Sequence, residues 1–323
     1  MSLWFKRHWF VIGLVLAVAV GALWPALGAN DSLLFPKVSI HLAIAVAFAI
    51  VGLTLPTTQL RSAIGLWKGH LAIQVFSFAV MPALAWLVAA AVEPLDPGLA
   101  TGVRILGCLP TTIATAALFT RTAGGDEALA LCNTTLGNLV GVVVTPALIV
   151  LIAERSGALD LGGAIAQIAR DVVVPFAIGQ SIRWPWVRRS GEPPAWLRQI
   201  PNVCVLIIVL LVFAGSVNSG GFEVGASLAL AFGAAAVLFS AGSLFAWWWA
   251  GWRGFGLGRG QRIAVLFCAS QKTLAVGVPL IAVLFAGDPR LALLTLPVLL
   301  YHLVQLVAGG IIAARMAAPK GKA

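Results

Sequence analysis

The chain has 323 residues, of which 60% are hydrophobic and only 10% are charged, and its mean hydropathy is +1.00. Soluble globular domains are about a quarter charged, so this composition excludes a water-soluble protein and predicts a membrane protein. The formal net charge of +10 could indicate a nucleic-acid-binding protein, but the basic residues are divided among loops between apolar stretches, which argues against that class.

The apolar residues fall into stretches of the length that crosses a bilayer, about 20 residues for a helix. Such a length indicates helices and excludes a barrel of short alternating strands. We therefore expect an all-α polytopic membrane protein with ten transmembrane helices. The stretches are 9–29, 38–58, 70–92, 100–120, 127–152, 163–182, 200–219, 226–250, 263–286 and 291–314.

Charge is unequally divided between the two sides of this ten-span arrangement. The loops on the side of the N-terminus hold most Lys and Arg, whereas the opposite loops hold most acids. The positive-inside rule then predicts a multi-pass protein of the plasma (cytoplasmic) membrane with both termini in the cytoplasm. A cleavable signal peptide is the alternative for 1–28. Its removal would leave nine spans and break the charge pattern.

The fourth stretch carries a polar interruption. Pro110 is followed by Thr111, Thr112 and Thr115. Proline frees a backbone carbonyl, and hydroxyls this close together can ligate a cation or donate to an anion. The alternative is that the hydroxyls bond back to their own helix.

The fifth stretch contains buried amides. Asn133, Thr134 and Asn138 lie beside Gly137, and the spacing places them on adjoining stripes of one helix. They can act as packing contacts between helices or as ion ligands, and the sequence leaves both readings open. Because an unsatisfied amide in hydrocarbon costs several kcal/mol, the amides of Asn133 and Asn138 are harder to dismiss as a site than two buried hydroxyls would be.

The eighth stretch ends in aromatic and basic residues. They are Trp247, Trp248, Trp249, Trp252, Arg253, Arg259 and Arg262. This composition is typical of an aromatic belt at a membrane interface followed by a basic cytoplasmic loop. The longest basic connection, 183–198, can contact anionic lipid. We expect membrane lipid as a partner, and no nucleic acid.

The ninth stretch holds the residues around which the site is predicted. They are Ser270, Gln271, Lys272 and Thr273. Lys272 is the only ionisable residue between Ile263 and Ala286. A lone ammonium at membrane depth is costly and should face a cavity or a polar partner. Gly277 and Pro279 follow and indicate a broken or kinked helix.

The tenth stretch adds a polar patch of one turn, Tyr301, His302 and Gln305. A histidine in a helical bundle is more often a packing residue than a proton relay. The four cysteines, by contrast, lie within apolar stretches without metal-ligand spacing and are interpreted as small packing residues. They are Cys108, Cys132, Cys204 and Cys268.

Several short motifs recur with a separation of 160 residues, among them Cys108 with Cys268 and Trp24-Pro25 with Trp184-Pro185. This spacing sets Thr112 opposite Lys272. Because five spans per half is an odd number, such a repeat would be inverted across the membrane, as in many secondary transporters. We expect the first repeat at 1–160 and the second at 161–323.

These motifs resemble the bile acid:sodium symporter superfamily, and more closely its branch of SBF-like membrane proteins. They include Met81-Pro82-Ala83, Cys108-Leu109-Pro110-Thr111-Thr112, Thr145-Pro146 and the polar residues of the ninth and tenth stretches. The resemblance implies a panel domain of spans 1, 2, 6 and 7 and a core domain of spans 3–5 and 8–10. In the core, spans 4 and 9 would be broken and cross. Some members of the branch are associated with calcium homeostasis.

The resemblance also implies a set of sodium ligands from spans four, five and nine. In this sequence the matching positions are Thr111, Thr112, Thr115, Asn133, Thr134, Asn138, Ser270 and Gln271. Sodium-binding members have an acid at the crossing in span nine, where this chain has no Asp or Glu from Ile263 to Ala286 and has Lys272 instead. Because an ammonium repels a hard cation, two sodium ions in the manner of the superfamily are not expected.

We therefore expect a secondary active transporter of a small organic, anionic solute, with no enzyme activity, no metal site and no resident cofactor. Lys272 takes the place of a coupling cation in this hypothesis and can pair with the solute. Burial disfavours a charged amine, so a proton is an alternative to Na⁺ as coupling ion. The candidate substrate- or ion-binding residues are the eight above with Lys272, Thr273, His302 and Gln305.

Other interpretations stay open. A sodium-coupled symporter could use backbone carbonyls with Thr112, Asn133 and Gln271. A metalloid exporter could use Cys108 as a thiolate, and a non-transporting sensor linked to calcium needs the same pocket as a carrier. A membrane enzyme is disfavoured, because the protease-like Gly124-Gly125-Asp126 has no second acid within any span.

Overall fold

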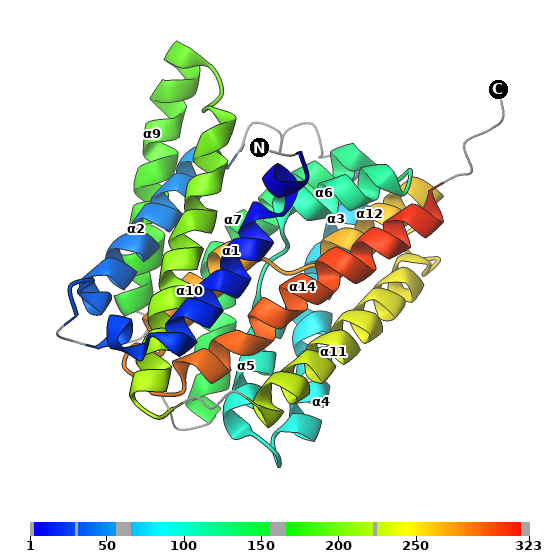
Figure 1. Cartoon of the computed structure of the whole chain (residues 1–323). Coiled ribbons are helices and arrows are strands. Elements are labelled where there is room, and N and C mark those ends of the chain that lie inside the picture. Colours follow the sequence, from blue (N-terminus) through cyan, green and yellow to red (C-terminus); the bar gives the residue numbers. More distant parts are fainter. Residues whose placement is uncertain (1–2, 30–31, 56–65, 156–165, 222–224, 318–323) are drawn as a thin grey trace. The chain divides into compact units, whose positions relative to one another are not determined.

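The computed structural model describes residues 3–29, 32–55, 66–155, 166–221 and 225–317, and within these ranges every regular element is a helix (Figure 1). The all-α class is therefore confirmed for the described residues. In chain order the elements are α1 (Leu3–Leu23), η1 (Pro25–Gly28), α2 (Pro36–Thr54), α3 (Trp67–Val75), η3 (Phe76–Val80), α4 (Met81–Val92), α5 (Pro97–Cys108), α6 (Ile113–Thr122), α7 (Glu127–Arg155), η4 (Ala169–Val173), α9 (Val174–Ser190), η5 (Ala195–Gln199), α10 (Ile200–Asn218), α11 (Ala226–Ala250), α12 (Arg259–Ser270), α13 (Leu274–Leu284) and α14 (Leu291–Met316).

Seven helical segments of the described chain are long and apolar enough to cross a membrane, and the bent pair α5 and α6 makes an eighth. The expected first span corresponds to the shorter apolar segment Trp9–Leu23. The expected sixth span begins at 163, outside the described residues. A membrane protein with several helical spans is thus confirmed, and the count of ten stays a prediction.

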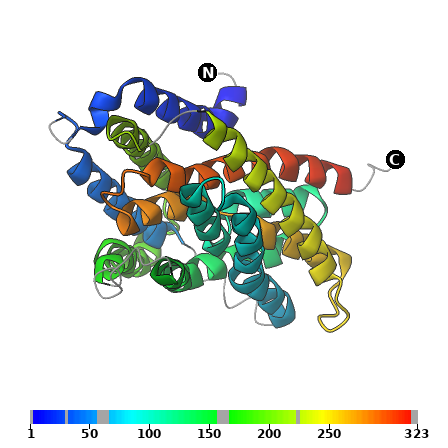
Figure 2. The ribbon, with the colours of Figure 1, turned by 90° about the horizontal axis from the view of Figure 1, so that it is seen from below.

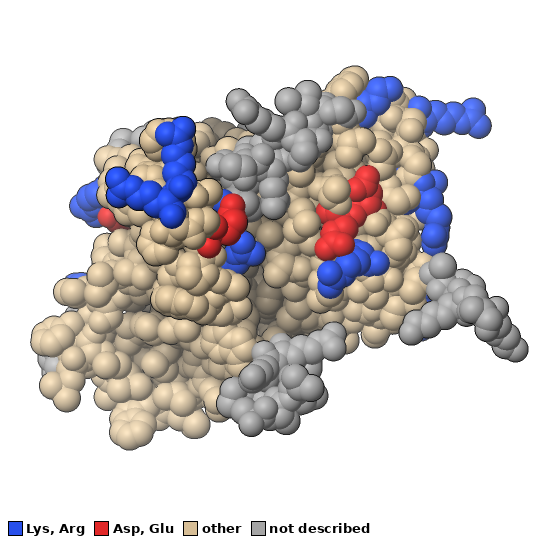
Figure 3. All heavy atoms as spheres, turned by 90° about the horizontal axis from the view of Figure 1, so that it is seen from above, with Lys and Arg blue, Asp and Glu red and all other residues tan. Residues whose placement is uncertain are grey.

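The surface agrees with this class. Large apolar side chains are exposed along the helices, as at Leu42, Leu87 and Leu244. In the view of Figure 3, charged side chains gather in a few groups, and wide areas of the surface have none. Contiguous apolar surface of this kind is costly in water and is expected where a protein faces lipid.

The chain forms two compact units. Unit 1 comprises Met1–Leu55, Val150–Leu228 and Leu274–Leu299. Its principal packing pairs are α2 with α9, α1 with α10 and α2 with α10 (Figure 1, Figure 2). Proline stands in the first turn of α2 and α10, where its fixed φ fits a helix start and its missing N–H is not needed.

Glycines allow the backbones of α2 and α9 to touch. A Cβ on Gly179 would collide with the carbonyl oxygen of Ala49, and a Cβ on Gly52 would collide with that of Phe176. Both obstacles are main-chain atoms of the facing helix, so no side-chain movement can relieve them. Small residues at a helix contact permit close backbone approach, a common basis of helix association in membranes.

We expect Gly179→Ala to destabilise the protein by about 1–3 kcal/mol, the usual cost of overpacking. Gly233→Ala is the matched control, because Gly233 lies in α11 with nothing within 4 Å of an added Cβ. Alanine there should be neutral or stabilising by up to about 1 kcal/mol. Thermal melting in detergent measures both, and equal melting temperatures for the two variants would contradict the close contact.

Unit 2 comprises Pro56–Ile149, Ala229–Thr273 and Leu300–Ala323. Its helices include α3 to α6, α12 and most of α7 and α11, and α4 packs along α5. Phe76 of η3 packs on Phe245 and Trp249 of α11, and the Trp249 indole N–H donates to the Ala72 carbonyl at 3.0 Å. These contacts hold α11 against the α3–η3 segment.

Two helices of unit 2 end in extended backbone inside the apolar stretches. After α5, Leu109 and Thr112 have ψ of 148° and 134°, and α6 continues with a 65° bend. Pro110 accounts for this break, since it disfavours a helical conformation at Leu109. After α12, Gln271 has ψ of 147° and α13 begins at Leu274.

Candidate functional site

The Lys272 side chain is buried, with 2% exposure, and its ammonium is fully hydrogen-bonded. Nζ donates to the carbonyl oxygens of Ser77 at 3.1 Å, Gly107 at 3.0 Å and Leu109 at 2.7 Å. A lysine ammonium has three N–H donors, and each has an acceptor here. The polar surroundings expected for this charge are therefore backbone carbonyls.

All three carbonyls come from places where a helix cannot use them fully. Gly107 and Leu109 lie at the C-terminal end of α5, where carbonyls lack partners in their own helix and carry the negative end of the helix dipole. Ser77 belongs to the π-helical turn η3, and such turns often occur at functional sites. The interruption of α5 thus forms an acceptor site for a cation, and Lys272 fills it.

Gln305 of α14 holds the extended backbone of Lys272. The Lys272 N–H donates to Gln305 Oε1 at 2.8 Å, and Gln305 Nε2 donates to the Lys272 carbonyl at 2.8 Å. Gln305 Nε2 also lies 2.9 Å from Nδ1 of His302. The Tyr301 hydroxyl donates to the Ser270 carbonyl. The polar patch of α14 therefore satisfies the backbone groups that the break exposes.

The two interrupted segments bond directly to each other. The Thr273 N–H donates to the Pro110 carbonyl at 3.0 Å. The Thr115 hydroxyl, at the start of α6, donates to Gln271 Oε1 at 2.5 Å. Both contacts lie within unit 2. They join the end of α12 to the break between α5 and α6.

The amides of α7 support the same region. Asn138 Nδ2 donates to the Thr111 carbonyl at 2.9 Å and to the Thr134 carbonyl at 2.8 Å. The Thr145 hydroxyl donates to the Cys108 carbonyl at 2.9 Å. Hence α7 supplies partners for two carbonyls near the break. Asn138 has a partner on another helix, as the cost of burying an amide requires.

A second polar cluster lies between α3 and α7. Gln74 Nε2 donates to Asn133 Oδ1 at 2.6 Å, and Asn133 Nδ2 lies 2.8 Å from Nδ1 of His70. His70 is a residue that the sequence reading missed. A signal was present, because His70 and Gln74 are four residues apart and share one face of α3.

Thr111 Oγ1, Gln271 Nε2 and Gln74 Oε1 are among the buried polar atoms that have no hydrogen-bond partner in the described residues. A Cβ on Gly137 would lie 3.3 Å from Gln74 Nε2 and 3.8 Å from Thr111 Cγ2, so these two side chains flank the same glycine. Unsatisfied buried polar atoms cost free energy and call for an explanation such as a bound solute.

The remaining candidate residues have more local roles. The hydroxyls of Thr134 and Ser270 donate to carbonyls of their own helices, those of Leu131 and Leu266. Thr112 is the N-cap residue of α6 without a side-chain cap. The structure links most of the predicted residues around Lys272, while Asn133 belongs to the cluster with His70.

The described part of this region has no buried carboxylate. No Asp or Glu is among the buried side chains of the described residues, and these residues contain no group of three His, Cys, Asp or Glu that could hold a metal ion. The carbonyls of Gly107 and Leu109, at the end of α5, are hydrogen-bonded to Lys272. A second positive charge a few ångströms from an ammonium in a poorly solvated site is strongly disfavoured.

An apolar helical protein with interrupted helices and a buried polar site is typical of membrane transporters. Residues 8–318 match the SBF-like CPA transporter family, and the chain belongs to this family. It is therefore a membrane transporter and not an enzyme.

The relatives share nearly the whole chain. Sodium/bile acid cotransporter 7 of Rattus norvegicus is 30% identical over 324 residues, covering 95% of this chain and 92% of the relative. The protein of the same name in Danio rerio is 29% identical over 315 residues, covering 95% and 93%. An uncharacterized protein of Pseudomonas aeruginosa is 30% identical over 327 residues, covering 95% and 92%.

Proposed function

We propose that the protein is a secondary active transporter of a small organic anion and that Lys272 serves as a tethered cation in the place of a coupling ion. The observation that carries this proposal is the set of three carbonyls around Lys272 Nζ. Oxygen atoms at an interrupted helix are the ligands that a hard cation prefers. A lysine that occupies them removes the need for sodium.

The anionic class of solute follows from the same charge. The buried charged side chains of the described residues are Arg104, Arg183 and Lys272. Both arginines are already paired with acids, Glu93 and Glu192. Lys272 is bonded only to neutral carbonyls, so its charge is uncompensated and attracts an anion. Thr111 Oγ1 and Gln271 Nε2, from the two interrupted segments, are unsatisfied donors that can bind such an anion.

The names of the vertebrate relatives mention sodium and bile acid, and we carry over only the class of an organic acid. For the architecture, we propose the ten-span arrangement of two inverted repeats, 1–160 and 161–323, with panel and core domains. The ends of α5 at Cys108 and of α12 at Ser270 lie within two residues of matching places in these repeats, which supports the proposal. The proposal also places the protein in the plasma (cytoplasmic) membrane, with both termini in the cytoplasm.

A sodium-coupled symporter with neutral ligands is the second candidate. It is favoured by Gln74 Oε1 and Thr111 Oγ1, two oxygen atoms without partners among the described residues, whose side chains both lie within 4 Å of a Cβ added to Gly137. A proton as coupling ion remains compatible with the first candidate, because Lys272 can lose its own proton.

Uptake by reconstituted liposomes tests the proposal. A panel of organic anions, with calcium and bile acids as further arms, is offered under sodium, pH and voltage gradients. We expect anion uptake that does not require sodium. Lys272→Met should fall to the level of empty liposomes, since methionine fills the space without a charge. Lys68→Met is the control, because Lys68 is exposed and lies over Trp67.

Unchanged uptake and unchanged sodium and pH dependence in Lys272→Met would overturn the role of Lys272. Uptake that requires sodium in the wild-type protein would favour the second candidate. Specific binding of an anion without any flux would identify a sensor instead of a carrier.

A further inference from the structure

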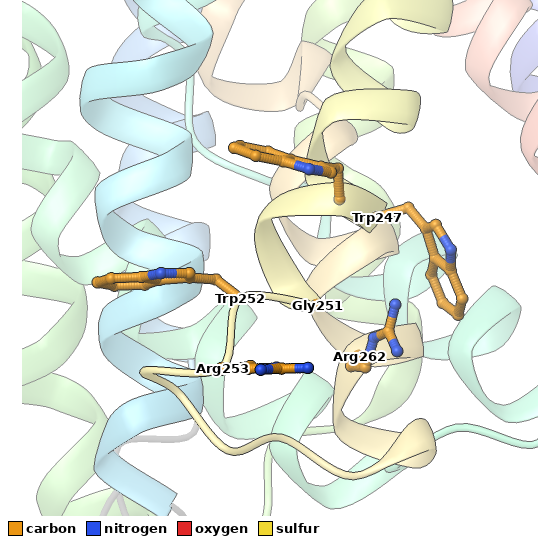
Figure 4. Close-up of a pocket in the computed structure, with 6 residues that line it drawn as sticks. Trp247, Gly251, Trp252, Arg253 and Arg262 are labelled. Atoms are coloured by element: carbon orange, nitrogen blue, oxygen red, sulfur yellow. The ribbon is translucent and has the colours of Figure 1, made fainter.

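A pocket of about 460 Å³ lies at the junction of α11 and α12, away from Lys272 and its partners. It is open to the surface. The loop between two membrane helices forms part of it, so it belongs to the membrane interface on that side. Its lining residues are Trp247, Trp248, Gly251, Trp252, Arg253 and Arg262 (Figure 4).

The two arginines of the pocket come from different elements. Arg253 follows the end of α11, and Arg262 lies in the first turn of α12. The Arg262 guanidinium lies over the Trp247 ring, 4.5 Å from its centroid, and its Nε is buried without a hydrogen-bond partner among the described residues. No acidic residue lines the pocket. The pocket is therefore positively charged and has unused donors.

Arg262 also lies directly against the backbone of Gly251. An added Cβ on Gly251 would lie 2.9 Å from Arg262 Nη2, so the guanidinium rests directly on the glycine. The planar guanidinium, fixed between a ring and a backbone, can present its N–H groups to a phosphate in a fork geometry. Gly251 thus makes room for the charged group.

An apolar path leads along α11 into the pocket. Val237, Leu244 and Trp248 are spaced on one face of α11, and Leu244 and Trp248 are 74% and 66% exposed. Phe245 stacks on Trp248 at 5.1 Å between ring centroids and fixes the indole beside the pocket. An acyl chain can lie along this face while its headgroup reaches the arginines.

We propose that this pocket binds the headgroup of an anionic phospholipid, with the phosphate between Arg253 and Arg262 and an acyl chain along α11. Tryptophan is favoured at the level of lipid headgroups, and basic residues near the surface attract anionic lipid. The two guanidinium groups repel the quaternary ammonium of phosphatidylcholine. The site should therefore prefer phosphatidylglycerol over phosphatidylcholine.

Native mass spectrometry of the full-length protein in detergent, titrated with dioleoylphosphatidylglycerol, measures the affinity. We expect about fivefold weaker binding in Arg253→Gln or Arg262→Gln and about 30-fold weaker binding in the double variant, as each basic residue near a membrane contributes about 1 kcal/mol. Gly251→Leu should also weaken binding, because it fills the pocket without removing a charge.

Arg259→Gln is the control variant, since Arg259 has the same charge in the same loop but donates to the Met316 carbonyl and does not line the pocket. It should bind like the wild type. Elution volume and melting temperature without lipid verify that each variant is folded. Equal lipid binding in the double variant and the wild type would overturn the proposal. So would an equal preference for phosphatidylcholine, or binding of soluble glycerol phosphate as tight as that of the lipid.

Discussion

Replacing Lys272 with alanine is expected to give the protein a sodium-dependent stability that the wild type lacks. The substitution leaves the carbonyls of Ser77, Gly107 and Leu109 around an empty space that the lysine side chain had filled. Oxygen ligands suit a hard cation, and the repelling charge is gone. At a sodium concentration of about 100 times Kd, binding would add about 2.7 kcal/mol of stability.

Melting temperatures in sodium chloride and in choline chloride at equal ionic strength measure this effect. Lys68→Ala is the control, because its lysine is exposed and bonds to none of these carbonyls. A folded Lys272→Ala protein that melts at the same temperature in both salts would show that the carbonyls do not form a cation site. A sodium response of equal size in the wild type would show that the ammonium does not occupy that site.

Gln305→Leu is expected to destabilise the protein by about 2–6 kcal/mol, since it leaves two buried backbone groups unsatisfied at about 1–3 kcal/mol each. The Lys272 N–H and carbonyl have their hydrogen bonds with this one side chain. Leucine has a similar volume and no polar atom, so the loss reports hydrogen bonding more than packing. Thermal melting in detergent measures the change.

The matched control is Gln199→Leu. Gln199 lies in η5 and is exposed, and among the described residues its side chain bonds only to Asn202. A surface change of this kind usually stays within about 0.5 kcal/mol. If Gln305→Leu and Gln199→Leu both had the melting temperature of the wild type, the break at Lys272 would not depend on α14.

The sequence was sufficient to predict what depends on side-chain chemistry. Hydropathy predicts the helical membrane class. The cost of a buried charge predicts that Lys272 has polar partners, and Pro110 predicts the break after α5. Each of these follows from a residue type that has few acceptable surroundings in a membrane.

The hydrogen-bond partners of Lys272 could not be predicted from the sequence in the same way. Ser77, Gly107 and Leu109 bind Lys272 through main-chain oxygen, which every residue possesses, so their side chains give no signal. The second break was expected near Gly277 and Pro279, yet both lie within α13. The chain leaves the helix earlier because Gln305 and the Pro110 carbonyl satisfy its backbone groups there.

A cation that is part of the polypeptide has an electrical consequence that a dissociable ion does not have. Sodium leaves with the solute, whereas the charge of Lys272 returns with the empty protein. If the site changes sides of the membrane, the loaded form carries a neutral pair and the empty form carries one positive charge. The membrane voltage then acts on the return step, with about 2.3 kcal/mol per 100 mV for a charge that crosses the whole field. An inside-negative potential would hold the empty site toward the cytoplasm and so favour release of an anion from the cell.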